Sequence, residues 1–414
     1  MASEHVDRAL APIVIDAMGS ARVVAILGPR QAGKSTLATR FAAANGHSIL
    51  TLDDELTRQR AQASPSAFIA EQPAGTVIDE IQRVPELMLA IKARVDRDNT
   101  RGQFLITGSA NLRRIPRVAD ALPGRVDYLT LWPLTQAELV GSEHRLLDSL
   151  LAGRPPRLTG QPIGLHHYAD RVLTGGFPET LDRTDAQRAR FFRDYVQSIV
   201  DRDLGDAGTV QRPDAVARLL RLVAARSGSL ASYERFGAEL GLDGKTALTY
   251  ADTLERLFLL RTRRAWLRNL GKRQIRSPKL YLSDTGLLGG LLGVTAERLE
   301  RDRGLAGAML ETFVTNEIER QEAWATYPAS LFHFRERDHE VDVVAEAPSG
   351  EVVGIEVKAG SGLDPRAFRG LELLRDRTGD AFQCGVLLYT GPQSIRFGDR
   401  LWAVPLSALW TPGE

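Results

Sequence analysis

A phosphate-binding loop is the feature that most restricts the fold of this chain of 414 residues. The stretch GPRQAGKST directly follows the apolar run VVAIL and matches G-x-x-x-x-G-K-[ST]. Glycines let backbone N–H groups surround a phosphate, the lysine reaches the β- and γ-phosphates, and the serine hydroxyl ligates Mg²⁺. We therefore expect ATP and Mg²⁺ as ligands. The predicted nucleotide-binding residues of the loop are Gly28, Pro29, Arg30, Gln31, Ala32, Gly33, Lys34, Ser35 and Thr36, with Ser35 also a metal ligand.

Two adjacent carboxylates, Asp79 and Glu80, follow a second β-rich run in the sequence TVIDE. Asp79 fits the acid that holds Mg²⁺ through its water shell, and Glu80 can orient or deprotonate an attacking water. The pair therefore predicts ATP hydrolysis, with Lys34 and Glu80 as catalytic residues. The next apolar run, FLITGSAN, offers three polar side chains for contact with the γ-phosphate or the water, with Thr107 taken as the nucleotide-binding one: Thr107, Ser109 and Asn111.

The order of the apolar runs predicts the fold class. RVVAIL, SILTL, GTVID and GQFLIT are short, rich in β-branched residues and each followed by a helical pattern, which is typical of a parallel sheet in an α/β protein. A helix, a turn at 242–244 and a second helix then predict a helix-turn-helix or winged-helix unit. We expect a P-loop domain over 1–140, a helical lid-like region over 141–210, a winged-helix-like domain over 211–300 and a C-terminal α+β domain over 301–414.

Six stretches together resemble the large prokaryotic group of AAA-type ATPases related to the archaeal ATPases. They are LGPRQAGKSTL, VIDEIQRVPEL, LITGSANL, LPGRVDYLTLWPLTQAEL, GGFPE and YVQSIVDRDL, and the resemblance runs along nearly the whole chain. It implies an ATP-hydrolysing AAA-type domain and a C-terminal domain of unknown function. It also implies that Arg125 or Arg202 supplies the arginine that stabilises transition-state charge, with Arg125 counted among the nucleotide-binding residues. An arginine acting in trans would require a homo-oligomer.

A basic ribbon lies at 261–279, where RTRRAWLRNLGKRQIRSPK carries eight basic residues and no acidic one. It follows the predicted second helix, where a winged-helix protein has its wing. Clustered positive charge beside such a helix pair is typical of contact with DNA phosphates, and Trp266 could stack on a base. A solvated face, or a contact with acids of another domain, would produce the same composition.

A predicted hairpin near the C-terminus combines HEVDVVAEA and EVVGIEVKAG around the turn PSG. A turn centred near residue 349 places Asp342 and Glu356 opposite one another, and strand alternation puts Lys358 on the face of Glu356. Two opposed carboxylates repel one another unless a cation lies between them. Lysine is scarce in this chain, with six in total, which strengthens the case that Lys358 has a role.

An upstream helix at about 305–324 adds a further acid. Glu317 falls near the centre of its apolar stripe, where a carboxylate is costly unless it is paired or ligates a metal, whereas Glu311 lies off the stripe and is expected to face solvent. The order helix Glu, Asp, then E-x-K resembles the PD-(D/E)XK nuclease fold. That resemblance implies Glu317, Asp342 and Glu356 as metal ligands and Glu356 and Lys358 as catalytic residues. Members of this fold that have lost activity are the alternative.

Whole-chain composition limits the function classes. The 53 basic and 52 acidic residues give a net charge of +1, so any DNA-binding surface must be local. A single cysteine excludes an internal disulfide, and the N-terminal residues show no signal-peptide pattern. No apolar run approaches the roughly 18 residues of a membrane span. We expect a cytoplasmic ATPase that acts on duplex or branched DNA, with Mg²⁺-dependent endonuclease activity left open. The alternative is a nucleotide-dependent regulatory switch with an inactive nuclease-fold interaction module.

Overall fold

The computed structural model describes residues 6–111, 124–160, 163–202, 212–268, 273 and 277–413, and the chain divides into two compact units. Unit one comprises Met1–Pro133 with Arg256–Phe258, and unit two comprises Leu134–Glu255 with Leu259–Glu414. The finer division of unit two at 210 and 300 stays a prediction. Within the described residues no helix is long and apolar enough to cross a membrane.

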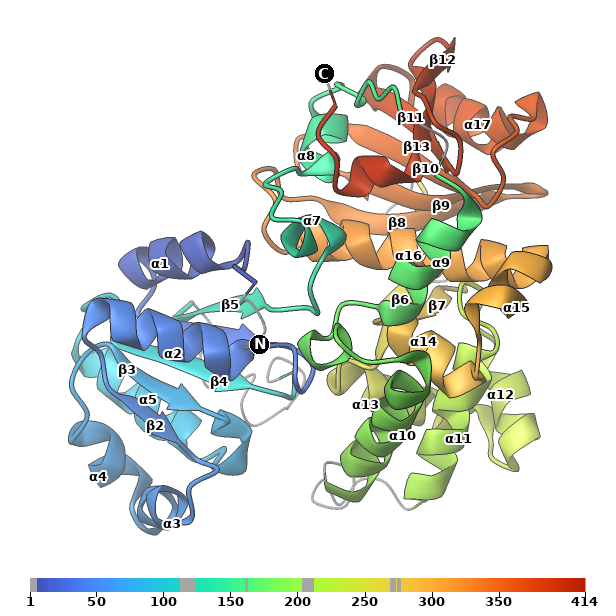
Figure 1. The fold of residues 1–414 in the computed structure, drawn as a ribbon. Coiled ribbons are helices and arrows are strands. Elements are labelled where there is room, and N and C mark those ends of the chain that lie inside the picture. The colour runs from blue at the N-terminus through green and yellow to red at the C-terminus, as the bar shows by residue number, and fades with distance from the viewer. Residues whose placement is uncertain are drawn as a thin grey trace. The chain divides into compact units, whose positions relative to one another are not determined.

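Unit one is a five-stranded sheet in the order β2-β3-β4-β1-β5 with every pair parallel (Figure 1). Every residue of β1 is buried, as its β-branched, uncharged sequence requires in a strand between two neighbours. The predicted parallel sheet is confirmed. The strands are β1 (Val23–Leu27), β2 (Ile49–Thr51), β3 (Thr76–Asp79), β4 (Phe104–Gly108) and β5 (Val126–Thr130).

Helices connect these strands, and α2 packs against β3 and β4. Parallel pairing brings the carboxyl ends of the strands to one edge of the sheet, which is where the phosphate loop and the Asp79 strand end meet. The elements are α1 (Ala11–Ser20), α2 (Lys34–Asn45), α3 (Glu55–Ala63), α4 (Pro65–Ala70), the 3₁₀ turn η1 (Ile81–Arg83) and α5 (Leu87–Arg97).

Unit two begins with helices and a two-stranded antiparallel sheet, in which Leu260 pairs with Leu282. The helices α11, α12 and α13 followed by β6 and β7 have the element order of a winged helix, as predicted. The elements are α7 (Gln136–Leu139), α8 (Leu146–Leu151), α9 (Leu165–Thr174), η3 (Pro178–Thr180), α10 (Asp185–Arg202), α11 (Pro213–Ala224), α12 (Tyr233–Leu240), α13 (Gly244–Arg256), β6 (Leu260–Arg263), β7 (Lys279–Leu282), α14 (Thr285–Leu292) and α15 (Ala296–Arg301).

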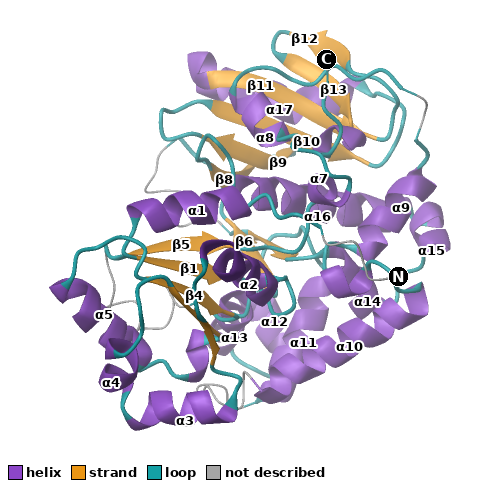
Figure 2. Ribbon diagram, turned by 60° about the vertical axis from the view of Figure 1, so that its left-hand side comes forward, coloured by secondary structure: helices purple, strands orange, loops and turns teal. Residues whose placement is uncertain are grey.

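The C-terminal part of unit two is a six-stranded mixed sheet in the order β12-β13-β11-β10-β9-β8. The long helix α16 packs against β9 and β10, and α17 packs against β9, β10 and β11 (Figure 2). The elements are α16 (Arg303–Glu322), β8 (Ser330–Glu336), β9 (His339–Glu346), β10 (Val352–Lys358), η5 (Pro365–Phe368), α17 (Arg369–Thr378), η6 (Gly379–Ala381), β11 (Phe382–Tyr389), β12 (Ile395–Gly398), β13 (Leu401–Pro405) and η7 (Leu406–Leu409).

Candidate functional site

The loop between β1 and α2 has the backbone that phosphate binding requires. A Cβ atom at Gly28 would collide with the carbonyl oxygen of Leu131, and Gly33 is left-handed (φ 96°) at the N-cap of α2. The first N–H groups of α2 therefore face the loop without intrahelical partners. The ammonium of Lys34, only 4% exposed, donates a hydrogen bond to the Pro29 carbonyl at 2.8 Å. The arrangement forms a compact phosphate cradle at a helix N-terminus.

Asp79 at the end of β3 accepts hydrogen bonds from two hydroxyl groups. Its Oδ1 accepts hydrogen bonds from Ser35 Oγ at 2.9 Å and Thr107 Oγ1 at 2.5 Å. Hydroxyl and carboxylate oxygens beside a phosphate cradle are the ligand types that Mg²⁺ prefers, so these residues fit the expected metal. The three residues come from the first turn of α2 and the carboxyl ends of β3 and β4, which parallel pairing makes neighbours.

Glu80 has an unusual backbone for a residue with a side chain, because its φ of 60° and ψ of 47° lie in the left-handed region. That conformation costs roughly 1–2 kcal/mol and persists only where neighbours hold it. The Glu80 N–H donates to Thr107 Oγ1 at 3.1 Å, and its Oε2 accepts from Ser109 Oγ at 3.2 Å. Gln82, which the sequence analysis missed, contacts the same carboxylate oxygen and donates to Ser109 Oγ at 2.8 Å.

Arg125 lies away from this cradle. In the parallel pair of β1 and β5, Val23 is opposite Val126 and Leu27 is opposite Thr130, so Arg125 is at the edge where the strands begin, roughly 16 Å from the edge that carries the loop. Hydrogen bonding to Arg125, whose Nη2 is 3.2 Å from Asp96 Oδ2, lowers the pKa of Asp96. The predicted contact of Arg125 with the nucleotide of its own loop is therefore wrong. The side chain of Arg202 lies outside the described residues.

The hairpin of unit two has the predicted register. Gly354 pairs with Val344 and Ile355 with Val343, and the same register sets Glu356 opposite Asp342. Asp342 Oδ2 accepts from the Val357 N–H at 2.9 Å, and Glu356 Oε1 bonds to Lys358 Nζ at 2.6 Å. Burial is the first cause that raises the pKa of both carboxyls, and each carboxyl has acidic neighbours that add to the effect.

Lys279 of β7 provides a cation that the sequence analysis did not place here. Its ammonium lies 2.7 Å from Glu311 Oε1 and 3.4 Å from Asp342 Oδ1, and it also contacts Glu340 Oε1. Burial opposes its charged form, but the surrounding groups outweigh burial and raise the pKa of Lys279. The scarcity of lysine in this chain, which we used as an argument for a role of Lys358, was an equally good argument for a role of Lys279. We call the acid cluster the set Lys279, Glu311, Glu340, Asp342, Glu356 and Lys358.

Neither helix acid has the role that we predicted, and the expectation that Glu311 faces solvent is wrong. Glu311 faces the acid cluster and accepts a hydrogen bond from the Tyr281 hydroxyl at 2.8 Å, and burial raises its pKa to about 7. Glu317 instead bonds to the Gln136 N–H at 2.8 Å and to Arg320 Nη1 at 3.2 Å. The predicted metal ligation by Glu317 is therefore wrong, because an arginine and a backbone amide satisfy this fully buried carboxylate elsewhere on α16.

The basic ribbon is only partly available for the predicted DNA contact, because Arg264 and Arg268 are exposed whereas other cations of the ribbon are paired inside the fold. Arg261 and Arg263 both pair with Glu319, and Arg263 Nη2 lies 3.1 Å from its Oε2. Arg273 pairs with Glu346 at 3.0 Å, and Trp266 is 4% exposed within the core of the C-terminal sheet. Half of the eight cations, counting Lys279, are therefore used inside the fold. Lys272 and Arg276 lie outside the described residues.

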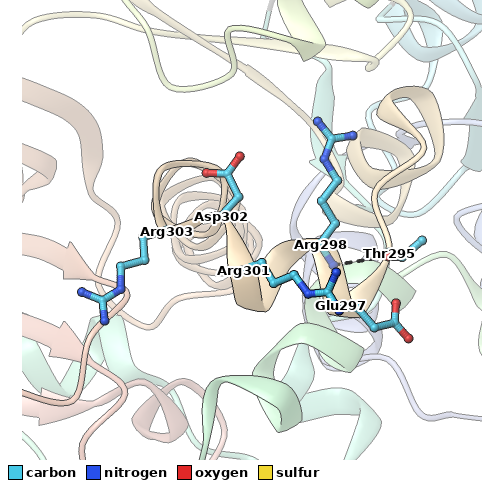
Figure 3. A pocket seen from close by; sticks show the side chains of 6 residues that line it. All are labelled: Thr295, Glu297, Arg298, Arg301, Asp302 and Arg303. Atoms are coloured by element: carbon cyan, nitrogen blue, oxygen red, sulfur yellow. Dashed lines mark hydrogen bonds between the residues drawn. The ribbon is translucent and has the colours of Figure 1, made fainter.

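Charged side chains line three of the cavities that the described residues of unit two form. The acid cluster lines one of 670 Å³, together with arginines that include Arg335 and Arg369. A second, of 660 Å³ at the junction of α15 and α16, has charged side chains that do not converge, and Arg303 points away from the others (Figure 3). The third, of 460 Å³, we call the arginine cavity. It has no acidic lining residue in the described chain and is lined by Gly153, Arg154, Pro155, Arg157, Gln383, Cys384, Arg396, Arg400 and Trp402.

A family model supports the assignment of unit one. Residues 20–140 match a family model described as an AAA domain, which confirms the AAA-type prediction. Residues 165–298 and 306–409 match two domains of unknown function, DUF8612 and DUF4143. A Walker-type ATPase of Pyrococcus abyssi, PABY2304, aligns with a TM-score of 0.40 and 12% identity over 70% of this chain and 97% of that chain.

Two mycobacterial proteins match over almost the whole chain. Uncharacterized protein Rv2008c of Mycobacterium tuberculosis and uncharacterized protein Mb2031c of Mycobacterium bovis are each 30% identical over 403 residues, which is 96% of this chain and 83% of each relative. The match therefore spans the AAA domain and both domains of unknown function of this chain. The chain therefore belongs to the same family as these two mycobacterial proteins, and its residues 20–140 are an AAA-type ATPase domain.

Proposed function

We propose that this chain hydrolyses ATP at the Glu80 site and uses the turnover to act on DNA. Ser35 and Asp79 would hold Mg²⁺, which when bound neutralises charge on the phosphate oxygens. Thr107 fixes Asp79, and the Lys34 ammonium exchanges the Pro29 carbonyl for phosphate oxygens. Glu80 accepts a proton from the attacking water. The observation that carries the hydrolytic role is the left-handed backbone of Glu80, which neighbouring side chains hold in place.

Two substitutions test hydrolysis. Lys34→Ala should abolish nucleotide binding, whereas Glu80→Gln should bind ATP normally and stop turnover, because an amide cannot accept the proton. Phosphate release and binding of a fluorescent ATP analogue measure the two effects separately. Glu86→Gln, an exposed glutamate near the site in sequence, is the matched control and should turn over normally. Retained turnover in Glu80→Gln would refute the role of Glu80.

The arginine cavity supports action on DNA, and it adds to the part of the basic ribbon that is not paired inside the fold. Arg157 and Arg396 lie 5.8 and 5.9 Å from the ring centre of Trp402, and no carboxylate among the described lining residues neutralises them. Guanidinium groups around an aromatic ring suit the phosphates and bases of a nucleic acid. The cavity is lined by Arg396 of the edge strand β12, and Gln393, just before that strand, forms an isolated antiparallel bridge with Thr159.

Fluorescence anisotropy with labelled duplex, forked and four-way DNA at low salt tests this proposal. Replacing Arg157 and Arg396 by Gln should weaken binding, and the slope of log affinity against log salt should fall by roughly 0.9 for each lost phosphate contact. Arg218→Gln, on the exposed side of α11, is the control. A wild-type protein that binds none of these DNA structures would refute the proposed action on DNA.

A regulatory switch with an inactive nuclease-fold module is the second candidate, and the position of Lys279 among the acids favours it. Under this alternative the ATPase rate is insensitive to DNA, and a protein partner is recovered by pulldown. An ATPase assay with and without the DNA panel separates the two, because a DNA-acting ATPase should turn over faster with its substrate. If the charge-stabilising arginine is Arg125 acting in trans, either function requires self-association.

A further inference from the structure

The cavity of the acid cluster already contains a cation. Lys279 is 3% exposed and contacts three carboxylates, from α16 (Glu311) and from β9 (Glu340 and Asp342). The nuclease resemblance implies a divalent metal among acids at this place. In the described part of the chain, however, no group of three or more histidines, cysteines or acids is arranged to hold a metal ion.

The partners of each carboxylate explain why the acid cluster is not arranged to hold a metal ion. Glu311 Oε1 is shared by Lys279 and Tyr281, at 2.7 and 2.8 Å. Asp342 uses one oxygen for Lys279 and the other for the Val357 N–H. Glu356 bonds to Lys358 through Oε1, which leaves the buried Oε2 without a partner. Glu311 Oε1, Glu356 Oε1 and both oxygens of Asp342 are therefore already bonded to donors of the protein, and Mg²⁺ or Mn²⁺, which take about six ligands, would have to displace those donors.

We infer that Lys279 is the resident cation of the acid cluster and excludes a divalent metal ion, so that the folded chain does not carry out metal-dependent cleavage at this cavity. The lysine performs the charge compensation that a metal performs in a nuclease. It has a single positive charge and no open coordination position, so it cannot activate a water as a metal does.

Lys279 also comes from a different element than the acids. It is the first residue of β7, which pairs with β6 in a separate two-stranded sheet, whereas the acids belong to α16 and the six-stranded sheet. Removal of its ammonium would free oxygens of Glu311, Glu340 and Asp342 beside the unpartnered Glu356 Oε2. That set of hard oxygen donors is suited to a divalent ion. The exclusion of metal therefore depends on one side chain.

Mn²⁺ titration followed by electron paramagnetic resonance tests the inference without DNA or ATP, so its outcome is independent of the proposed action on DNA. All proteins carry Ser35→Ala to remove a metal ligand of the phosphate loop. With Lys279 present, Glu356→Gln should leave the free Mn²⁺ signal unchanged. Lys279→Ala should bind one additional Mn²⁺ per chain, and Lys279→Ala with Glu356→Gln should lose that ion. Lys245→Ala, an exposed lysine on α13, is the control and should gain none.

Two results would overturn the inference. The first is a Mn²⁺ ion bound by the chain with Lys279 intact and lost on Glu356→Gln. The second is a Lys279→Ala protein that is folded by circular dichroism but gains no Mn²⁺. The first result needs no substitution of Lys279, so the inference stays open to refutation even where Lys279→Ala fails to fold.

Discussion

Arg320→Met should destabilise unit two severely, because Arg320 is the cation of a second buried network. Its Nη1 donates to the Leu134 carbonyl at 2.8 Å and Glu317 Oε1 at 3.2 Å, and its Nη2 donates to the Ser283 carbonyl at 3.2 Å and Asp284 Oδ2 at 2.8 Å. Asp284 and Glu317 are both 0% exposed. Loss of the guanidinium leaves Asp284 as a buried charge and two carbonyls without this donor.

The magnitude follows from the burial of these partners. Burial already raises the pKa of Glu317 to about 7, so in the variant this carboxyl takes up a proton and avoids an unpaired charge. Asp284 keeps the N–H groups of Gly176 and Leu287, which moderates its cost. Breaking one partner of a buried ion pair costs about 3–5 kcal/mol, and we expect a loss in this range. At roughly 2–4 °C per kcal/mol, the melting temperature should fall by about 10 °C.

Calorimetry of wild type, Arg320→Met and Arg320→Lys measures this loss. Lysine keeps the charge for Asp284 but lacks the planar fork that reaches two carbonyls and two carboxylates, so Arg320→Lys should lose less than Arg320→Met. Arg218→Met, an exposed arginine on α11, should change stability by no more than about 0.5 kcal/mol. Two results would show that Arg320 does not compensate buried charge. One is an equal loss of stability in the Arg320→Met and Arg320→Lys variants, and the other is a loss below about 1 kcal/mol in the Arg320→Met variant.

Three further predictions concern single side chains. Because burial raises the pKa of Glu317 from 4.5 to about 7, its stabilising contribution should be complete below pH 4.5 and lost as the pH rises through 7. Urea unfolding of wild type and Glu317→Gln should show this as a pH-dependent difference of roughly 3 kcal/mol. Thr107→Val removes the hydroxyl that fixes Asp79 and should lower kcat about tenfold in an ATPase assay, with the melting temperature as the check on folding. Arg125→Ala should leave the affinity of the monomer for ATP unchanged by calorimetric titration, and weaker binding would contradict its place at the far edge of the sheet.

The ATP site was predictable because its residues lie at positions that local sequence defines. The loop follows β1, and Asp79 and Thr107 lie at the carboxyl ends of the apolar strands β3 and β4, which parallel pairing brings together without further information. The hairpin register that opposes Asp342 to Glu356 was predictable for the same reason, since one turn determines it. We placed Arg125 at the wrong end of its strand, because a sequence motif shows that an arginine is present but does not show at which end of the strand it lies.

Buried charge partners were the part that sequence pattern could not supply. The ribbon at 261–279 has the composition of a DNA-binding surface, yet Arg263 and Arg273 are 6% and 7% exposed and paired with glutamates more than 50 residues away. Composition reports how many cations a segment has. It does not report whether distant acids will neutralise them, and for Arg261, Arg263, Arg273 and Lys279 they do.

Helix α16 shows why the position of a glutamate relative to an apolar stripe does not predict whether that glutamate belongs to the acid cluster. Glu311 and Glu317 are six residues apart and so project about 120° from one another around the helix. Both directions are enclosed, Glu311 by Lys279 and Tyr281 and Glu317 by Arg320 and the Gln136 amide. The stripe argument correctly required a partner for Glu317 but could not distinguish a metal from an arginine. Which network a buried carboxylate joins depends on the element that carries its cation. For Glu311 that element is β7, and for Glu317 it is α16 itself.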